Sequence, residues 1–320
     1  MKRFFHISDI STYRSELMGW AIIWIMMLHF TFTQLHPIGF IAQYGFAGVD
    51  IFMLVSGMGL YFSLEKDDNI FRFYKKRLLR IFPTYFILGI IYSIFLFHDT
   101  ILEYLFRYTT IGFWTGGKYS EWYVPSIVML YLFAPLIKKV FDSKKIWILG
   151  ILISFILSLA YYLVDKEYLL DRDHFFFTYR ITAFILGMVC AYWIKKDKSK
   201  YFIYLMIAGI PFFVYLFPQY HTFYQYKYLS LLFLLPFFTN IFIILSKYLG
   251  RLRMIIVETG KASLEIYLIQ GMFFYAIITK QLLIPTSYHD AISIFLIIFC
   301  ALAGILTHRL IGKSRINSLF

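Results

Sequence analysis

Long apolar runs recur along this 320-residue chain at intervals that leave only short connections between them. A helix needs about 20 apolar residues to cross the hydrocarbon core of a bilayer. In that core each backbone N–H and C=O must be paired within the segment, so each run is predicted to be a helix. The sequence therefore predicts an all-α, polytopic integral membrane bundle of about ten transmembrane helices, at residues 17–35, 45–64, 81–97, 122–137, 146–164, 176–194, 201–217, 229–245, 264–279 and 291–310.

Composition supports the same class. Of all residues, 60% are hydrophobic and 15% are charged, whereas soluble domains have about 25% charged residues. A soluble fold of this length would have to expose much of that apolar surface to water. We find no internal repeat and no appended soluble segment, so residues 1–320 are predicted to form a single transmembrane domain.

Lys and Arg are concentrated in alternate connections between the runs, for example at residues 66–80, 138–145, 195–200 and 309–315. The positive-inside rule places these connections, and with them both chain termini, in the cytoplasm. We therefore expect a multi-pass protein of the cytoplasmic (inner) membrane, with membrane lipid as its surroundings. The net charge of +13 reflects this topology, and nucleic acid is not an expected partner.

Two ionisable residues lie inside the first two runs. His29 is surrounded by apolar residues in the first run, and Asp50 lies near the start of the second. Ionisable groups within a span are costly and mark candidate functional sites. Because the two runs are antiparallel, both residues should reach a similar depth, where the Asp50 carboxylate could orient His29 as a general base. The alternative is that His29 is a hydrogen-bonded packing residue.

The densest basic cluster, residues 75–80, precedes the third run. Arg77 and Arg80 are spaced i, i+3, so on a helix they would project together and could bind a phosphate. The alternative is an anchor to anionic lipid. Arg14, on the helical face of His29, could likewise bind headgroups or an anionic substrate entering from the cytoplasm.

The predicted outer connections, at residues 112–121, 165–174 and 218–228, are rich in aromatic and polar residues. They fit an interfacial aromatic belt, or a surface that binds sugars. Glu121, Trp122 and Arg180 lie at outer helix ends and are candidates for binding such a sugar substrate, although they could instead be structural.

Cys190 and Cys300 both lie within apolar runs, and no CxxC, HExxH or paired Cys/His spacing occurs. Such cysteines behave as small hydrophobic residues. We expect buried thiols, no metal site and no permanently bound cofactor.

Several motifs occur in a fixed order, at residues 16–19, 28–30, 45–52, 56–57, 73–85, 122–125, 131–136, 180–187 and 263–269. Together they resemble the acyltransferase family 3 membrane proteins over nearly the whole chain. The resemblance implies that acyl-CoA is the donor substrate, and that the acceptor is a sugar, a lipid or a related molecule. It also implies that His29 matches the essential histidine of the family and that Arg77 and Arg80 match its RxxR motif, where the phosphates of CoA would bind.

The chain departs from this family at two positions. Where many members have an Arg eleven positions before the His, this chain has Met18, and Arg14 could substitute for it. Members often end the 263–269 motif with His, where this chain has Gln270, so no catalytic role is assigned to Gln270. The esterase-like domain of some members is absent from this sequence, so the membrane domain is expected to complete the transfer.

The expected reaction is transfer of an acyl group, with acetyl favoured, from cytoplasmic acyl-CoA to a hydroxyl of a surface glycan or lipid-linked saccharide. His29, oriented by Asp50, would be the base, and Arg77, Arg80 and Arg14 would bind the donor. The alternatives are a transporter or flippase for a lipid or small polar metabolite, which would also use intramembrane His and Asp, and a membrane scaffold without activity. The oligomeric state stays open.

Overall fold

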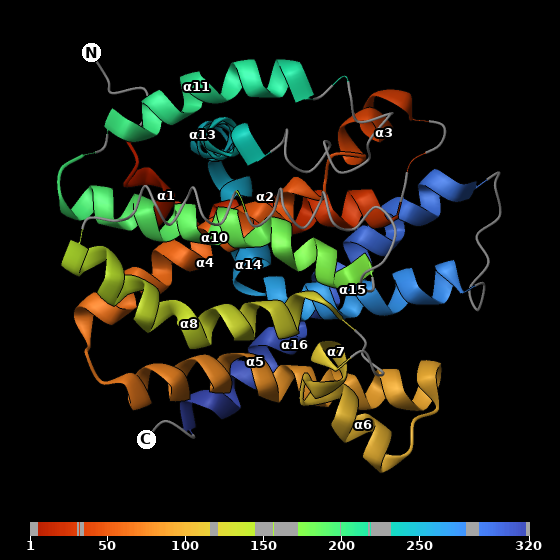
Figure 1. Cartoon of the computed structure of the whole chain (residues 1–320). Helices are drawn as coiled ribbons and strands as arrows, with labels where there is room; N and C mark the ends of the chain where they lie inside the picture. Colours follow the sequence, from red (N-terminus) through yellow and green to blue (C-terminus); the bar gives the residue numbers. More distant parts are fainter. Residues whose placement is uncertain are drawn as a thin grey trace. The chain divides into compact units, whose positions relative to one another are not determined.

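The computed structural model describes residues 6–30, 32, 35–115, 121–144, 156, 172–198, 200–216, 218, 232–279 and 288–317. Within these ranges every regular element is a helix (Figure 1). In chain order the elements are α1 (Asp9–Thr12), α2 (Arg14–His29), α3 (His36–Ala42), α4 (Ala47–Lys66), α5 (Ile70–Tyr92), the π-helix η1 (Ser93–Phe97), α6 (Ile101–Tyr108), α7 (Ile111–Trp114), α8 (Tyr123–Lys144), α10 (Arg172–Lys195), α11 (Lys200–Leu216), α13 (Leu235–Tyr248), the 3₁₀ helix η3 (Gly250–Leu252), α14 (Arg253–Lys261), α15 (Ser263–Ile278) and α16 (His289–Asn317).

The all-α prediction is confirmed for the described part of the chain. Every predicted run except 146–164 overlaps one of these helices, and that run lies outside the described residues apart from Ile156. Five described helical segments are long and apolar enough to cross a membrane: Ala47–Lys66, Ile70–Phe97, Tyr123–Asp142, Phe177–Lys195 and His289–Gly312. A sixth span is possible if Gly250–Lys261 and Ser263–Ile278, which meet at a 73° bend, form one broken span. The chain is therefore a helical membrane protein, while ten spans and cytoplasmic termini remain predictions.

Exposed apolar side chains on these helices suit a lipid environment. On α16, Phe295, Leu302, Leu306 and Leu310 are each at least 60% exposed. A soluble protein would rarely leave such a continuous row in water, whereas lipid tails solvate it without cost. Cys190 and Cys300 are buried, as predicted.

The chain divides into two compact units. Unit 1 comprises Met1–Leu17, Val49–Tyr74 and Ser126–Arg253, and unit 2 comprises Met18–Gly48, Lys75–Pro125 and Met254–Phe320. The single domain over residues 1–320 stays a prediction, and each unit is described by itself below.

In unit 1, α4 and α10 pack closely because each has a glycine at the contact. A Cβ atom at Gly57 would collide with the backbone oxygen of Phe184, and one at Gly187 would collide with the backbone oxygen of Leu54. Small residues let membrane helices approach until dispersion contacts and polar pairs form. The same unit contains a network of ion pairs, in which Glu65 pairs with Lys138 (3.0 Å) and with Lys195.

In unit 2, α2 ends at His29, although the apolar run was predicted to continue as a helix to residue 35. The start of α16 provides the reason. The Ser293 hydroxyl donates to the backbone oxygen of Phe30, and the Asp290 carboxylate accepts the backbone N–H of Leu35 at 2.8 Å. These bonds give Phe30 and Leu35 partners on α16 instead of partners within α2. His29 therefore lies at a helix end and not six residues before it.

Helix α5 begins earlier than the predicted run, at Ile70. The basic cluster at residues 75–80, expected just before a helix, therefore lies inside one. Beyond Tyr92 the helix loosens into η1, which ends at His98 in the left-handed conformation (φ 51°). π-Helical turns occur often at functional sites.

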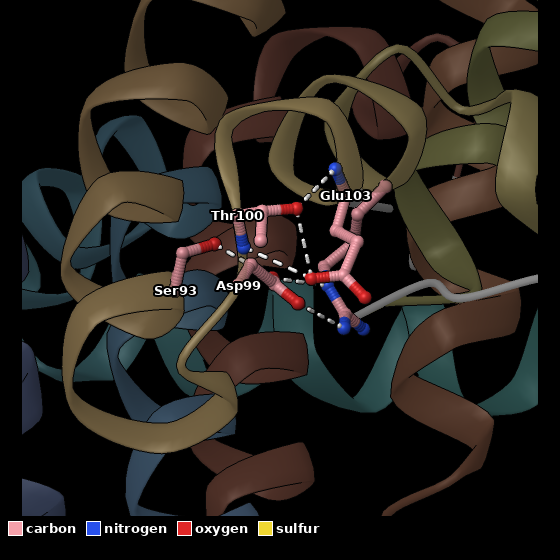
Figure 2. Close-up of polar contacts among 5 residues, drawn as sticks. Ser93, Asp99, Thr100 and Glu103 are labelled. Atoms are coloured by element: carbon pink, nitrogen blue, oxygen red, sulfur yellow. Dashed lines mark hydrogen bonds and ion pairs between the residues drawn. The ribbon is translucent and has the colours of Figure 1, made fainter.

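A buried ion pair follows η1 and fixes α6 (Figure 2). Arg107 donates to both carboxylate oxygens of Asp99, at 2.8 and 2.9 Å, and Ser93 donates to the same carboxylate at 2.9 Å. Thr100 and Glu103 form a capping box at the start of α6, which satisfies two of the orphan N–H groups there. The Asp99 and Arg107 side chains are 0% and 7% exposed.

Acidification should weaken this cluster. Burial disfavours the Asp99 carboxylate, but hydrogen bonds from Arg107 and Ser93 outweigh it and hold the pKa of Asp99 below its ordinary value. A depressed native pKa contributes stability at pH values above the unfolded pKa of about 3.9, and the contribution is lost as pH falls through the native pKa. We expect Asp99→Asn to lower the melting temperature at pH 7 and the difference from wild type to shrink below about pH 4.

The matched control is Asp68→Asn, which removes the same charge from an exposed residue. It should change the melting temperature little at either pH. A difference between Asp99→Asn and wild type that stays constant from pH 7 to pH 3 would contradict the assignment.

Candidate active site

His29 is held by two residues of α15 in unit 2. Its Nδ1 atom lies 2.7 Å from Oε1 of Gln270, in hydrogen-bonding contact. Its ring stacks on Phe274, with centroids 4.3 Å apart and planes inclined by 16°. Gln270 and Phe274 are one helical turn apart, so they present neighbouring side chains on one face of α15. The imidazole therefore has a fixed plane and a defined partner.

Gln270 is a residue to which the sequence analysis assigned no role. It is fully buried, and its Nε2 atom donates to the backbone oxygen of Tyr267 at 3.3 Å. The available signal was a polar amide inside an apolar run, which must find partners when buried.

The side chains of Tyr92 and Glu121 contact α15 near Gly271, the residue after Gln270. The Tyr92 hydroxyl bonds Oε1 of Glu121 at 3.0 Å and also the backbone oxygen of Leu268. Gly271 makes this possible, because a Cβ atom there would collide with the Glu121 carboxylate and lie 2.8 Å from the Tyr92 hydroxyl. Glu121 and His29 thus reach α15 at adjacent residues, whose side-chain directions differ by about 100°.

Aromatic rings surround this part of α15. The Tyr123 ring packs against Tyr267, with centroids 5.2 Å apart, and Trp122 packs edge-on against Tyr123. Phe97 of η1 meets Tyr275 edge-on at 4.9 Å. The predicted residues Glu121 and Trp122 therefore lie in unit 2 with His29, near the same helix.

The predicted donor-binding residues Arg77 and Arg80 project from α5 of unit 2, as their i, i+3 spacing predicts. Arg77 is half-buried and Arg80 is exposed. From Arg80 to Tyr92, which bonds beside Gly271, α5 rises about 18 Å. One helix therefore links the basic cluster to the surroundings of His29.

Thr84, which lies between Arg80 and Tyr92 on α5, contacts a buried acidic residue that the sequence analysis did not single out. Oε1 of Glu265 accepts a hydrogen bond from Thr84 at 3.2 Å and lies 3.2 Å from Nδ1 of His308. Glu265 is 1% exposed. Its position in the 263–269 motif was visible, but its partners come from α5 and α16.

Asp50 and Arg180 form an ion pair in unit 1, through Oδ2 and Nη1, and each side chain is 2% exposed. The sequence analysis proposed that Asp50 orients His29 and that Arg180 contacts the acceptor. In the structure Gln270 occupies the Nδ1 position of His29, and Arg180 is the partner of Asp50. Arg14, also in unit 1, has its guanidinium against Gly59, where a Cβ would lie 3.4 Å away.

Fold and site together define a helical membrane protein with a histidine oriented by the buried Gln270 and the half-buried Phe274. A family model described as an acyltransferase domain matches residues 17–309. This match covers most of the chain and includes His29, Arg77, Arg80 and Gln270. The chain belongs to the acyltransferase 3 family, as the resemblance in the sequence indicated.

One curated relative is a viral protein, "Putative acetyltransferase ORF330" of Acidianus two-tailed virus, which is 26% identical over 209 residues. The alignment covers 58% of this chain and 58% of the length of that relative. No solved structure matches the chain significantly.

Proposed function

We propose that this membrane acyltransferase moves an acyl group, acetyl in the first instance, from acyl-CoA to a hydroxyl of a surface glycan or lipid-linked saccharide. The observation that carries the proposal is the orientation of His29 between Gln270 and Phe274 within the acyltransferase domain. A catalytic base needs a fixed position and a nitrogen that can accept a proton, and the contacts of the ring with Gln270 and Phe274 support this role for His29. Membership of the family and the acetyltransferase name of one relative support the acyl-transfer chemistry.

In the proposed reaction, the hydroxyl oxygen of the acceptor attacks the thioester carbonyl carbon. A C–O bond forms, the C–S bond breaks, and the electron pair of that bond leaves with the CoA sulfur. His29 removes the hydroxyl proton and passes it to the sulfur, so the products are an ester and free CoA. No oxidant, metal or second donor is needed for the atoms to balance.

The donor end of the proposal is the Arg77–Arg80 pair. Guanidinium groups bind phosphate oxygens in bidentate pairs, and CoA has its phosphates and its thioester at opposite ends of a long flexible arm. The roughly 18 Å rise of α5 between Arg80 and Tyr92 suits a donor of that shape. Arg14 is retained as a candidate contact for the anionic end of the donor.

The acceptor end of the proposal is Glu121 with Trp122. Carboxylate and aromatic groups suit the hydroxyls and apolar faces of a sugar, and Glu121 meets α15 beside Gln270. Arg180 receives a structural role, since its ion pair with Asp50 is buried. We further propose that the chain lies in the cytoplasmic (inner) membrane with both termini inside, so that the donor binds from the cytoplasm.

Donor binding tests this proposal without knowledge of the acceptor. A ligand at 100 times its dissociation constant adds about 2.7 kcal/mol to the stability of the folded state. We expect acetyl-CoA to raise the melting temperature of the protein in lipid nanodiscs, and Arg77→Ala/Arg80→Ala to abolish the rise.

Lys75→Ala/Lys76→Ala is the matched control, because it removes the same charge from exposed positions of the same helix. It should leave the response to acetyl-CoA largely intact. If both double variants lose the response to acetyl-CoA equally, the basic cluster at residues 75–80 attracts anions and lipid headgroups in general and is not a specific CoA site. A folded wild-type protein that binds no acyl-CoA but moves a solute across proteoliposomes would instead support the transporter alternative.

A further inference from the structure

The environment of Gln270 fixes which of its two amide atoms faces His29. Its nitrogen lies 3.3 Å from the backbone oxygen of Tyr267, which can only accept a hydrogen bond. Rotating the amide by 180° would place its oxygen against that carbonyl, with two acceptors facing each other at a fully buried position. Such an unpaired arrangement is costly without water, so the amide oxygen faces Nδ1 of His29.

This orientation determines the protonation of the imidazole. An amide oxygen has no proton to donate, so the 2.7 Å contact requires a proton on Nδ1. A neutral imidazole carries one N–H, and its other nitrogen is then an acceptor. Nε2 is therefore the nitrogen with the free electron pair.

The ring also resists turning around. It stacks on Phe274, and the residue after it is tied to α16 through the bond from Ser293 to the backbone oxygen of Phe30. A ring turned by 180° would exchange Nδ1 for a carbon and lose the bond to Gln270. Partners on α15 and α16 thus fix both the position and the plane of the imidazole.

We propose that Gln270 is a positioning residue that holds His29 in the Nδ1–H tautomer and so makes Nε2 the atom that exchanges protons with substrate. The use of Nε2 in acyl transfer rests on the proposed function, but the tautomer itself does not. During transfer the Gln270 oxygen continues to accept the Nδ1 proton while Nε2 gains one, so the imidazolium keeps a partner.

The tautomer can be measured directly by ¹⁵N NMR of histidine-labelled protein in lipid nanodiscs. The His29 signals are identified by their loss in His29→Gln. We expect a protonated Nδ1 and an unprotonated Nε2 in the wild type at a pH where the ring is neutral. A dominant Nε2–H form in the folded wild type would overturn the inference, whether or not the protein transfers acyl groups.

Two variants separate the hydrogen bond from packing. Gln270→Met has similar volume but no oxygen, and we expect it to lose the preference for Nδ1–H. It should lower kcat about 10-fold, because Nε2 then carries the proton in part of the population and the imidazolium formed during transfer lacks its hydrogen-bond partner. Gln270→Glu retains an acceptor oxygen and should retain the proton on Nδ1. If His29 keeps the Nδ1–H tautomer in Gln270→Met, Gln270 does not determine the tautomer and the proposal is wrong.

Gln43→Met, at the C-terminal end of α3, is the control and should leave the His29 signals unchanged. The experiment keeps the two proposals apart. An Nδ1–H tautomer in a protein that does not bind acyl-CoA would support the inference and refute the proposed function. Binding of acyl-CoA by a protein whose His29 is in the Nε2–H tautomer would refute only the inference.

Discussion

Replacing His29 with alanine should lower the rate of acyl transfer by about 10²–10⁴-fold, the usual contribution of a positioned general base. Each tenfold loss corresponds to about 1.4 kcal/mol of transition-state stabilisation. Binding of acetyl-CoA should persist, because this variant keeps all the proposed contacts of the donor phosphates, Arg77, Arg80 and Arg14. The rate is measured as release of CoA thiol by purified protein in nanodiscs supplied with an envelope saccharide fraction.

His98→Asn is the matched control for this experiment. His98 is exposed and has a left-handed backbone (φ 51°), which asparagine tolerates. This variant should retain wild-type activity. If His29→Ala is folded and transfers acyl groups within threefold of wild type, His29 is a packing residue and the proposed base lies elsewhere.

Breaking the ion pair between Asp50 and Arg180 should produce the largest loss of stability. Removing one partner of a buried pair costs about 3–5 kcal/mol, because the other charge stays buried without compensation. Arg180→Met, which leaves the Asp50 carboxylate in place, is therefore expected to be severely destabilised. Unfolding by denaturant in mixed micelles, with the free energy extrapolated to zero denaturant, measures the loss.

The double variant Asp50→Leu/Arg180→Met completes the test. When both charges are replaced by apolar side chains, much of the stability should return, as happens at other buried pairs. Strictly additive losses would show that the two residues do not stabilise each other. If the double variant is stable but inactive, Asp50 has the catalytic importance that the sequence suggested; if it is stable and active, the pair is structural.

Some features of the site were predictable because they depend on local spacing. Arg77 and Arg80 were expected to project together from a helix, and α5 includes both. The polar residues in the first two runs were identified as costly in lipid, and both have buried partners in the structure. The resemblance to the family rested on ordered motifs and is confirmed over residues 17–309.

The partners of these residues could not be predicted, because they come from helices distant in sequence. Gln270 is 241 residues from His29, and Arg180 is 130 residues from Asp50. The spacing of His29 and Asp50 along two consecutive runs favoured a direct pair. In the structure the partner of Nδ1 of His29 is Gln270 of α15.

The sequence by itself determined the membrane class, the helical content, the approximate position of each described span and the family. It could do so because the hydrocarbon core requires every span to satisfy its own backbone hydrogen bonds. The tertiary structure alone decided which buried polar groups meet, because side chains lose their water on burial and must find partners wherever packing places them. For this reason a glutamine with no role in the sequence argument became the residue that orients the candidate catalytic histidine.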